Sequence, residues 1–193
     1  MALQANDSCR AVFLDRDGVL NVDKGYVHRE SDLELIGGVA LALRRLKDLG
    51  YLLIVVTNQS GVARGLYGTA EVEGFHAALS AAIKEAGGPQ IDDYFYCPHL
   101  ESGTDAKFAV ACDCRKPKPG MLLAATKKHG IDLARSFIVG DKADDIEAGH
   151  RVGVAGIQVG VAYGPPHADA IAVVESLADA LPYITGSAAA PNA

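Results

Sequence analysis

The chain has 193 residues, 49% of them hydrophobic and 22% charged, which is typical of a globular domain with a substantial core. Its formal net charge of −6 argues against a nucleic-acid-binding protein that uses a broad basic face. Residues 1–10 contain no apolar core of signal-peptide length, and no segment is apolar enough to span a bilayer. We therefore expect a cytoplasmic monomer with no nucleic-acid or membrane partner, built as a single domain over residues 1–193.

Short apolar runs alternate with segments of helical periodicity along most of the chain. In chain order the sequence predicts a strand over 12–14, a helix over 39–49, a strand over 51–56, a helix over 71–86, a strand over 91–97, a helix over 120–129, a strand over 136–139, a helix over 146–151 and a strand over 155–161. Strands separated by helices favour an α/β fold, a doubly wound parallel sheet with helices on both faces and a core over about residues 11–183. Residues 21–38 and 98–119 remain as long irregular segments, which are usually functional, and residues 187–193 read as a frayed tail.

Two aspartates follow the first predicted strand, in the run Asp15-Arg16-Asp17-Gly18. In an extended chain the side chains of Asp15 and Asp17 point to the same side. Two like charges at this spacing are unfavourable without a cation or a shared proton, and the carboxyl ends of parallel strands are where such sheets usually bind ligands. The pair therefore indicates a divalent metal site in which one carboxylate is free to attack and the other to transfer protons.

Three further polar clusters lie near the ends of predicted strands. The run Thr57-Asn58-Gln59-Ser60-Gly61 follows the second strand, and Gly140-Asp141-Lys142 follows a later one, with two more aspartates close behind. The basic run Arg115-Lys116 lies between them. Each cluster alone also fits an ordinary turn, helix cap or solvated loop. If the strands are parallel neighbours, however, all of these side chains meet at one edge of the sheet, which favours a single site.

This set of side chains matches the needs of phosphate-ester hydrolysis, which uses a nucleophile, a proton donor, a divalent cation and donors around the phosphoryl oxygens. Asp15 is the predicted nucleophile that forms an aspartyl-phosphate, and Asp17 is the predicted general acid and base. The predicted magnesium ligands are Asp15, Asp141 and the backbone carbonyl of Asp17. The side chains predicted to hold the phosphoryl group are Thr57, Arg115, Lys116 and Lys142.

Three of the four cysteines gather with a histidine in a metal-binding pattern. Cys97 and His99 form a C-x-H pair, and after a spacer of twelve residues Cys112 and Cys114 form a C-x-C pair. Three thiolates and one imidazole complete a tetrahedral zinc site with no open position, so we expect a structural rather than a catalytic metal. The alternative is a chance group of reduced side chains. The zinc is expected to order the loop over 97–114 and to help fix the two cations that follow Cys114.

In this order the motifs resemble the haloacid dehalogenase superfamily of aspartate-nucleophile phosphatases, over about residues 11–165. The resemblance implies the same roles for Asp15 and Asp17. The metal-binding pattern and the basic run after it narrow it to a zinc-containing branch that holds heptose bisphosphate phosphatases and histidinol-phosphate phosphatases and has no large cap domain. Ser60 and the length of the spacer favour the heptose enzymes. The resemblance further implies a pocket lined by Asp23, Lys24, Gly25, Tyr26, Thr57, Asn58, Gln59 and Ser60, with Arg115, Lys116 and Lys142 on the phosphates.

By this resemblance the expected function is the magnesium-dependent removal of one phosphate from D-glycero-D-manno-heptose 1,7-bisphosphate, giving the 1-phosphate in heptose biosynthesis. One alternative is a histidinol-phosphate phosphatase or a broader small-molecule phosphatase. Another is a non-catalytic binding module stabilised by zinc. Retention of both aspartates of the first motif argues against that module.

Several other residues carry smaller expectations. Tyr67 can alter the rim of the pocket, and Asp145 is expected either to orient Lys142 or to add an outer contact to magnesium. No chemical role is predicted for Cys9. Helix-end or surface positions are predicted for His76, His129 and His150.

Overall fold

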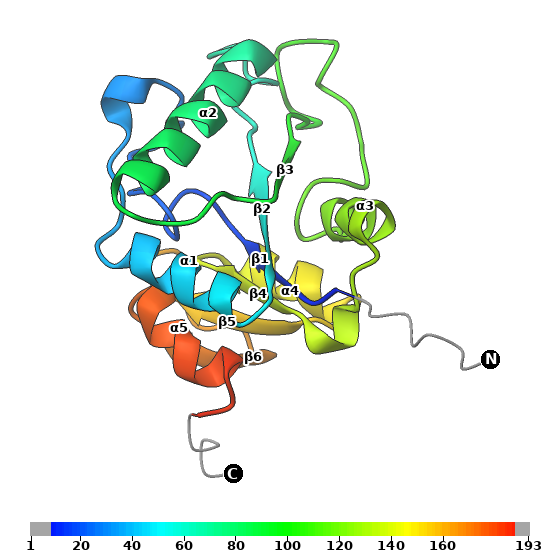
Figure 1. Ribbon diagram of the computed structural model, residues 1–193. Coiled ribbons are helices and arrows are strands. Elements are labelled where there is room, and N and C mark those ends of the chain that lie inside the picture. Colours follow the sequence, from blue (N-terminus) through cyan, green and yellow to red (C-terminus); the bar gives the residue numbers. More distant parts are fainter. Residues whose placement is uncertain (1–8, 188–193) are drawn as a thin grey trace, which may run out of the picture.

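The centre of the fold is a six-stranded, fully parallel sheet with the strand order β3-β2-β1-β4-β5-β6 (Figure 1). It is seen in a computed structural model that describes residues 9–187. Of the tail predicted over 187–193, all but Ser187 lies outside the described residues. The strands are β1 (Ala11–Leu14), β2 (Leu52–Asn58), β3 (Asp93–Cys97), β4 (Phe137–Gly140), β5 (Ala155–Val159) and β6 (Ala170–Val174).

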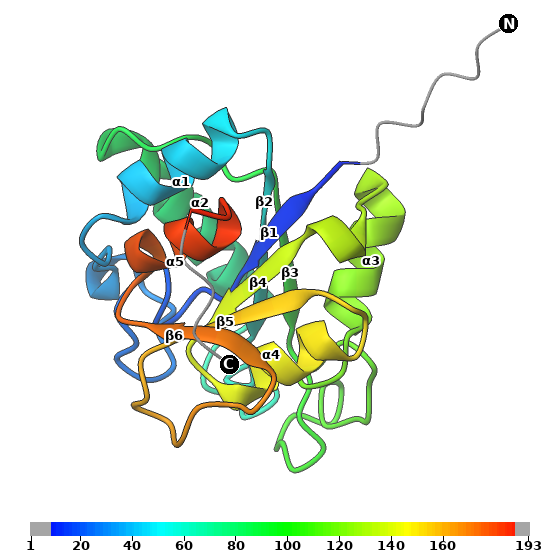
Figure 2. The same ribbon diagram turned by 90° about the horizontal axis from the view of Figure 1, so that it is seen from below.

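Helices cover both faces of this sheet (Figure 2). On one side lie α1 (Val39–Asp48), α2 (Thr69–Glu85) and α5 (Leu177–Ile184), and on the other lie α3 (Gly120–His129) and α4 (Ala143–His150). Two short 3-10 helices, η1 (Glu30–Asp32) and η2 (Leu133–Arg135), complete the described elements. None of these helices combines the length and the hydropathy needed to cross a membrane.

The central strand β1 is buried on both faces, as its unbroken apolar sequence requires. Val12 and Leu14 belong to the core cluster under α1 and α5, whereas Ala11 and Phe13 belong to the cluster under α3. Phe13 is in register with Ile54 of β2 and with Ile138 of β4. Because β1 is held between two neighbours, the residues that follow it are placed at the middle of the sheet edge.

All nine predicted elements are present with small shifts at their ends, and the predicted doubly wound parallel fold is confirmed. The helix predicted over 146–151 begins earlier, at Ala143, because the Asp145 carboxylate accepts the backbone N–H of Lys142 at 3.1 Å and caps the first turn. The sequence did not predict β6 and α5. Strand β6 lies at the sheet edge with alternating exposure, but its five residues form a continuous apolar run like those of the inner strands, so a strand signal was present in the sequence.

The prediction of a surface position for His76 is wrong. Its side chain lies on the inner face of α2, is only 6% exposed, and stacks on the Tyr94 ring with 4.6 Å between centroids. Burial, helped by the charge of Arg16, lowers the pKa of His76 to about 3. His76 completes the buried helical stripe that includes Val72 and Leu79, so its burial follows from the period of α2.

Candidate active site

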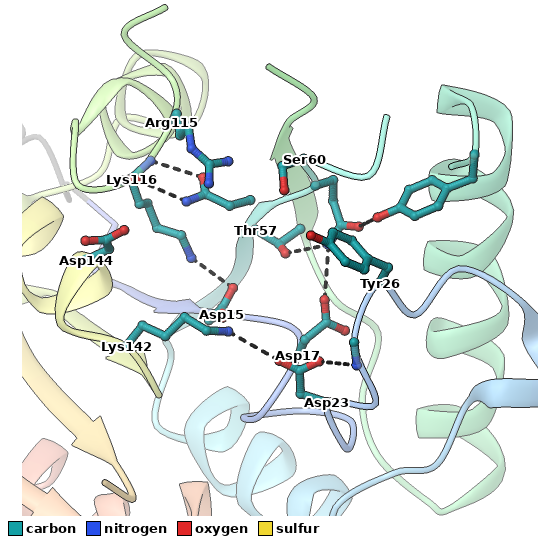
Figure 3. A pocket seen from close by; sticks show the side chains of 14 residues that line it. Asp15, Asp17, Asp23, Tyr26, Thr57, Ser60, Arg115, Lys116, Lys142 and Asp144 are labelled. Carbon is teal, nitrogen blue, oxygen red and sulfur yellow. Dashed lines mark hydrogen bonds and ion pairs between the residues drawn. The ribbon is translucent and has the colours of Figure 1, made fainter. Parts of the chain in front are cut away.

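A cavity of about 300 Å³ opens at the carboxyl edge of β1 and β2, where the first two polar clusters meet the basic run and the start of α4 (Figure 3). Parallel topology brings the carboxyl ends of these strands to the same side of the sheet, as the sequence predicts. The side chains in the cavity wall come from five separate parts of the chain. They are Asp15, Asp17, Asp23, Gly25, Tyr26, Thr57, Asn58, Gln59, Ser60, Tyr67, Arg115, Lys116, Lys142 and Asp144.

At the floor of this cavity, a buried amine joins two carboxylates. Lys116 Nζ lies 2.8 Å from Asp15 Oδ1 and 2.5 Å from Asp145 Oδ1, and it donates to the carbonyl of Val56 at 2.6 Å. Lys116 is 2% exposed. Although burial opposes its charge, Asp145 and Asp15 raise the pKa of Lys116 above its ordinary value, so the amine stays charged. A permanent cation therefore contacts the predicted nucleophile.

Asp141 supplies a third buried carboxylate beside Asp15. Neither Asp141 oxygen has a hydrogen-bond partner among the described residues, and Lys142 Nζ lies 3.5 Å from Oδ2. Burial and the neighbouring Asp15 charge raise the pKa of Asp141 to about 8. Gly18, at φ +88°, leaves the room for this carboxylate, since a Cβ there would overlap Asp141 Oδ2.

These carboxylates fit a hard divalent cation. One oxygen each of Asp15, Asp141 and Asp145 lies within 4.8 Å of the other two. Both oxygens of Asp145 are already engaged, one by Lys116 and one by the backbone of Lys142. Asp15 and Asp141 are therefore the side chains with oxygens available to a metal such as magnesium, which prefers oxygen ligands.

Asp17 is held on both oxygens by side-chain donors. Arg16 donates to Oδ1 at 3.0 Å and to Oδ2 at 2.8 Å, Asn21 donates to Oδ1 at 2.9 Å, and Gln59 donates to Oδ2 at 3.1 Å. The Arg16 guanidinium is fully buried, stacks over the Phe75 ring and also donates to the carbonyl of Val27. This network fixes the Asp17 carboxylate in the wall of the same cavity as Asp15.

The polar run after β2 forms a second wall and is linked to the basic loop. Gln59 Nε2 donates to Thr57 Oγ1 at 2.9 Å, and Tyr67 donates to Gln59 Oε1 at 2.9 Å. Asn58 accepts the backbone N–H of Lys116 at 3.1 Å and donates to the backbone carbonyl of Lys116 at 3.0 Å. Because these two bonds are reciprocal, Asn58 fixes the backbone from which the buried Lys116 amine extends.

The loop after β1 forms the third wall. Asp23 Oδ2 lies 3.3 Å from Lys142 Nζ, and Asp23 Oδ1 accepts the backbone N–H of Gly25 at 2.8 Å. Tyr26 is half exposed at the cavity rim, with φ 52°. Lys24 is absent from the wall: its amine pairs with Glu34 at 2.9 Å and its side chain is 45% exposed. Lys24, which the resemblance places in the pocket, is thus directed toward Glu34 and not into the cavity.

The cysteines and histidine of the long loop converge beside this site. Cys97 Sγ lies 3.1 Å from Cys114 Sγ and 3.6 Å from Cys112 Sγ, and His99 Nδ1 lies 3.2 Å from Cys114 Sγ. One ligand atom from each of the four residues lies within 4.8 Å of the others. The hydrogen bond shared by the two closest sulfurs raises the pKa of Cys97 and lowers that of Cys114 to about 5. The chemistry and spacing of this set fit a tetrahedral zinc ion, whose ligands lie about 3.8 Å apart when Zn–S bonds are about 2.3 Å long.

Comparisons with known proteins support the assignment of this cavity to a phosphatase. A HAD-hydrolase-like family model matches residues 113–180. A D-glycero-β-D-manno-heptose-1,7-bisphosphate 7-phosphatase from Haemophilus ducreyi is 43% identical over 181 residues, which cover 91% of this chain and 98% of that protein. The chain belongs to this phosphatase family. The heptose bisphosphate phosphatase of the same description from Escherichia coli strain K12 is 45% identical over 159 residues, 82% of each chain.

Solved structures show the same haloacid dehalogenase-like architecture. A HAD-like phosphatase from Mesorhizobium loti aligns with a TM-score of 0.82 and 35% identity, covering 95% of this chain and 90% of that one. A D,D-heptose 1,7-bisphosphate phosphatase from B. bronchiseptica, complexed with magnesium and phosphate, aligns with a TM-score of 0.78 and 32% identity, covering 93% and 99%. The predicted family resemblance is confirmed, and the chain is a phosphoric monoester hydrolase of this family.

Sequence reasoning missed two features of the cavity. It considered Tyr67 only for the pocket rim, whereas the hydroxyl of Tyr67 bonds Gln59 and its ring stacks on His28 at 4.4 Å between centroids. It also placed Asp145 beside Lys142 or magnesium, and the structure adds the pairing with the Lys116 amine. The glycine at position 61 is the sequence feature that relates to the position of Tyr67, because any Cβ there would overlap the Tyr67 ring.

Proposed function

We propose that this protein removes the 7-phosphate from D-glycero-β-D-manno-heptose 1,7-bisphosphate and leaves the 1-phosphate. The observation that carries the proposal is the 41–45% identity to proteins of that description over 82–91% of the chain. The cavity supports it, because carboxylates, cations and hydroxyls surround one open space. That the protein acts as a cytoplasmic monomer on a free small-molecule sugar phosphate stays a prediction from the sequence.

Two metals belong to this proposal. Magnesium would be held by Asp15, Asp141 and the backbone carbonyl of Asp17, where it would offset the negative charge of the carboxylates and of the bound phosphoryl group. Zinc would be held by Cys97, His99, Cys112 and Cys114 in a structural role.

Asp15 is the proposed nucleophile. Its carboxylate lies at the end of β1, where its backbone N–H donates to the carbonyl of Val139 at 2.9 Å. This bond ties the residue to the neighbouring strand and fixes the direction of attack. One Asp15 oxygen accepts from Lys116 and has a second lone pair for the metal, which leaves the other oxygen to form the bond to phosphorus and give an aspartyl-phosphate.

Asp17 is the proposed acid and base, and its hydrogen bonds say how it takes up a proton. Each Asp17 oxygen accepts two hydrogen bonds, which occupy both of its lone pairs. A proton can therefore bind to the carboxylate only after one of these donors has turned away. The bond from Gln59, at 3.1 Å, is the longest of the four. We propose that Gln59 releases Oδ2, which then carries the proton to the leaving alkoxide and later accepts one from the hydrolytic water.

Fixed cations and donors around the phosphoryl oxygens complete the mechanism. Lys116 and Lys142 bring charge from the two sides of Asp15, Thr57 offers its hydroxyl, and Arg115 lies at the cavity mouth (Figure 3). Because Lys116 is anchored by two carboxylates, its position does not have to change as charge develops on the phosphoryl group. Ser60, Gly25 and Tyr26 line the outer part of the cavity, where the sugar would lie.

The test is phosphate release in the presence of magnesium, with the β anomer, the α anomer and histidinol phosphate compared in parallel. We expect the largest kcat/KM for the β anomer. A preference for histidinol phosphate would keep the chemistry and overturn the substrate. Asp15→Asn should abolish turnover while circular dichroism shows an intact fold, and equal turnover in that variant would overturn the assignment of the nucleophile.

A further inference from the structure

The loop that joins β5 to β6 is closed at its base by one buried side chain. Gln158 is 2% exposed and lies near the end of β5. Its Oε1 accepts the backbone N–H of His167 at 2.9 Å, and its Nε2 donates to the carbonyl of Gly160 at 3.4 Å. Both ends of the segment 160–167 are therefore attached to the same amide, so the loop leaves the sheet in a defined direction (Figure 2).

Near the tip of this loop, Tyr163 contacts two residues of the cavity wall. Its hydroxyl donates to Asp23 Oδ2 at 2.7 Å. Its ring lies beneath the Lys142 ammonium, with 4.2 Å from Nζ to the ring centroid. Lys142 Nζ also lies 3.3 Å from Asp23 Oδ2, so the three side chains contact one another pairwise.

The hydrogen bonds and charges among Asp23, Tyr163 and Lys142 favour a charged carboxylate and a neutral phenol. Burial alone would raise the pKa of Asp23, but bonds from Tyr163, Gly25 and Lys142 lower it below its ordinary value. The same bond to Asp23, together with burial, raises the pKa of Tyr163 to about 12, so the phenol remains a donor at neutral pH. Tyr163 itself is 55% exposed and is not part of the cavity wall.

We propose that Tyr163 is a positioning residue for substrate binding, which holds Asp23 and Lys142 in the orientation that a phosphorylated, polyhydroxylated substrate meets. The proposal rests on the proposed function for the kind of substrate. The Tyr163 hydroxyl bonds Asp23, so this bond acts on binding of the sugar portion. The Tyr163 ring contacts Lys142, which is assigned to the phosphoryl group, so the ring also acts near phosphorus. A small aromatic phosphate ester, which lacks the polyol, should sense loss of the ring but not loss of the hydroxyl.

The experiment compares Tyr163→Phe and Tyr163→Ala with Val161→Ala, a matched change at an exposed position of the same loop. Tyr163→Phe removes the hydrogen bond and keeps the ring over Lys142; Tyr163→Ala removes both. In Tyr163→Phe we expect KM for the heptose bisphosphate to rise about fivefold with kcat within twofold of wild type. In Tyr163→Ala we expect KM to rise more than tenfold and kcat to fall, because Lys142 also loses its ring contact. With p-nitrophenyl phosphate, kcat and KM of Tyr163→Phe should match those of Val161→Ala. For Tyr163→Phe, a KM equal to that of Val161→Ala on both esters, or an equal loss of kcat on both, would overturn the proposal.

A double-mutant cycle tests whether Tyr163 acts through Asp23. In the Asp23→Asn background, Tyr163→Phe should raise KM by less than twofold, because the acceptor it positions has already been changed. A full fivefold effect in that background would overturn the positioning role. Failure of the proposed function would show separately, as a wild-type preference for another ester. The variants would then be compared on that ester, and the same KM ratios between variant and wild type would test the positioning role of Tyr163.

Discussion

Replacing Lys116 by methionine is the most direct test of the cavity floor. Lys116 Nζ has three partners, the carboxylates of Asp15 and Asp145 and the carbonyl of Val56. Methionine keeps most of the apolar stem and removes the charge. Three carboxylates then remain at the floor, those of Asp15, Asp141 and Asp145. Lys142, which contacts Asp141, is the one remaining cation among the side chains that contact them.

The expected cost follows from burial. Removing one partner of a buried ion pair costs about 3–5 kcal/mol, and here two carboxylates lose the same partner. Protonation of Asp145, whose pKa is raised by burial to about 6, limits the loss. We therefore expect the free energy of unfolding to fall by about 4 kcal/mol at neutral pH, toward the middle of that range. The loss of a fixed donor next to the reacting group should also lower kcat by about 10²–10³-fold.

Urea unfolding and phosphate release measure the two effects. The matched control is Lys47→Met, which breaks an exposed pair with Asp92 at 2.5 Å and should cost at most about 1 kcal/mol. In the double variant Lys116→Met with Asp145→Asn, one unpaired charge is gone, so part of the stability should return while kcat stays low. The reasoning is refuted if Lys116→Met unfolds at the same urea concentration as Lys47→Met, or if the double variant recovers full turnover.

Three further predictions test other parts of the structure. Gly18→Ala should lower kcat more than tenfold, because the new Cβ displaces Asp141. The control Gly153→Ala is also at positive φ but has open space around it, so it should lower only the stability. Equal kcat in the two variants would contradict this account. Metal analysis should find one zinc per wild-type chain. Cys112→Ser should lose this zinc and melt about 10 °C lower, while Cys9→Ser should do neither. Zinc retained in Cys112→Ser would count against the ligand set. The unfolded state regains the ordinary His76 pKa of 6.5 and binds one more proton than the folded state between pH 6.5 and 3. The free energy of unfolding of wild type should therefore fall by about 2 kcal/mol between pH 7 and 5 because of this group, and that of His76→Phe should fall correspondingly less in urea unfolding. Identical losses in the two proteins would place the acid sensitivity elsewhere.

The sequence predicts the strands and the site to the extent that local pattern decides them. The inner strands β1, β2 and β4 are continuous apolar runs, and polar residues begin where each run ends. Parallel pairing then places Asp15, Thr57 and Asp141 at one edge without any knowledge of side-chain packing. Edge strand β6 is also a continuous apolar run, although alternate residues face solvent, so the same pattern could have indicated it.

Contacts between distant segments could not be predicted, because no spacing rule relates them. Lys116 reaches Asp15 across 101 residues, and Tyr163 reaches Asp23 across 140. The burial of His76 is a different case: its position in the stripe of α2 was readable, but a titratable side chain was assumed to avoid the core. Stacking on Tyr94 offsets part of the cost of that burial.

The zinc loop and the catalytic floor are joined by a short chain of contacts that gives the proposed structural metal a functional consequence. Cys97 ends β3, and its carbonyl accepts the backbone N–H of Gln59 at 2.8 Å. Asn58, the residue before, holds the backbone of Lys116 on both sides, and Lys116 lies two residues beyond Cys114. Fixing the thiolates thus fixes both ends of the bridge through Asn58, and with it the amine that contacts the nucleophile. Loss of the metal should therefore lower activity through the position of Lys116, even though none of the zinc ligands lines the cavity.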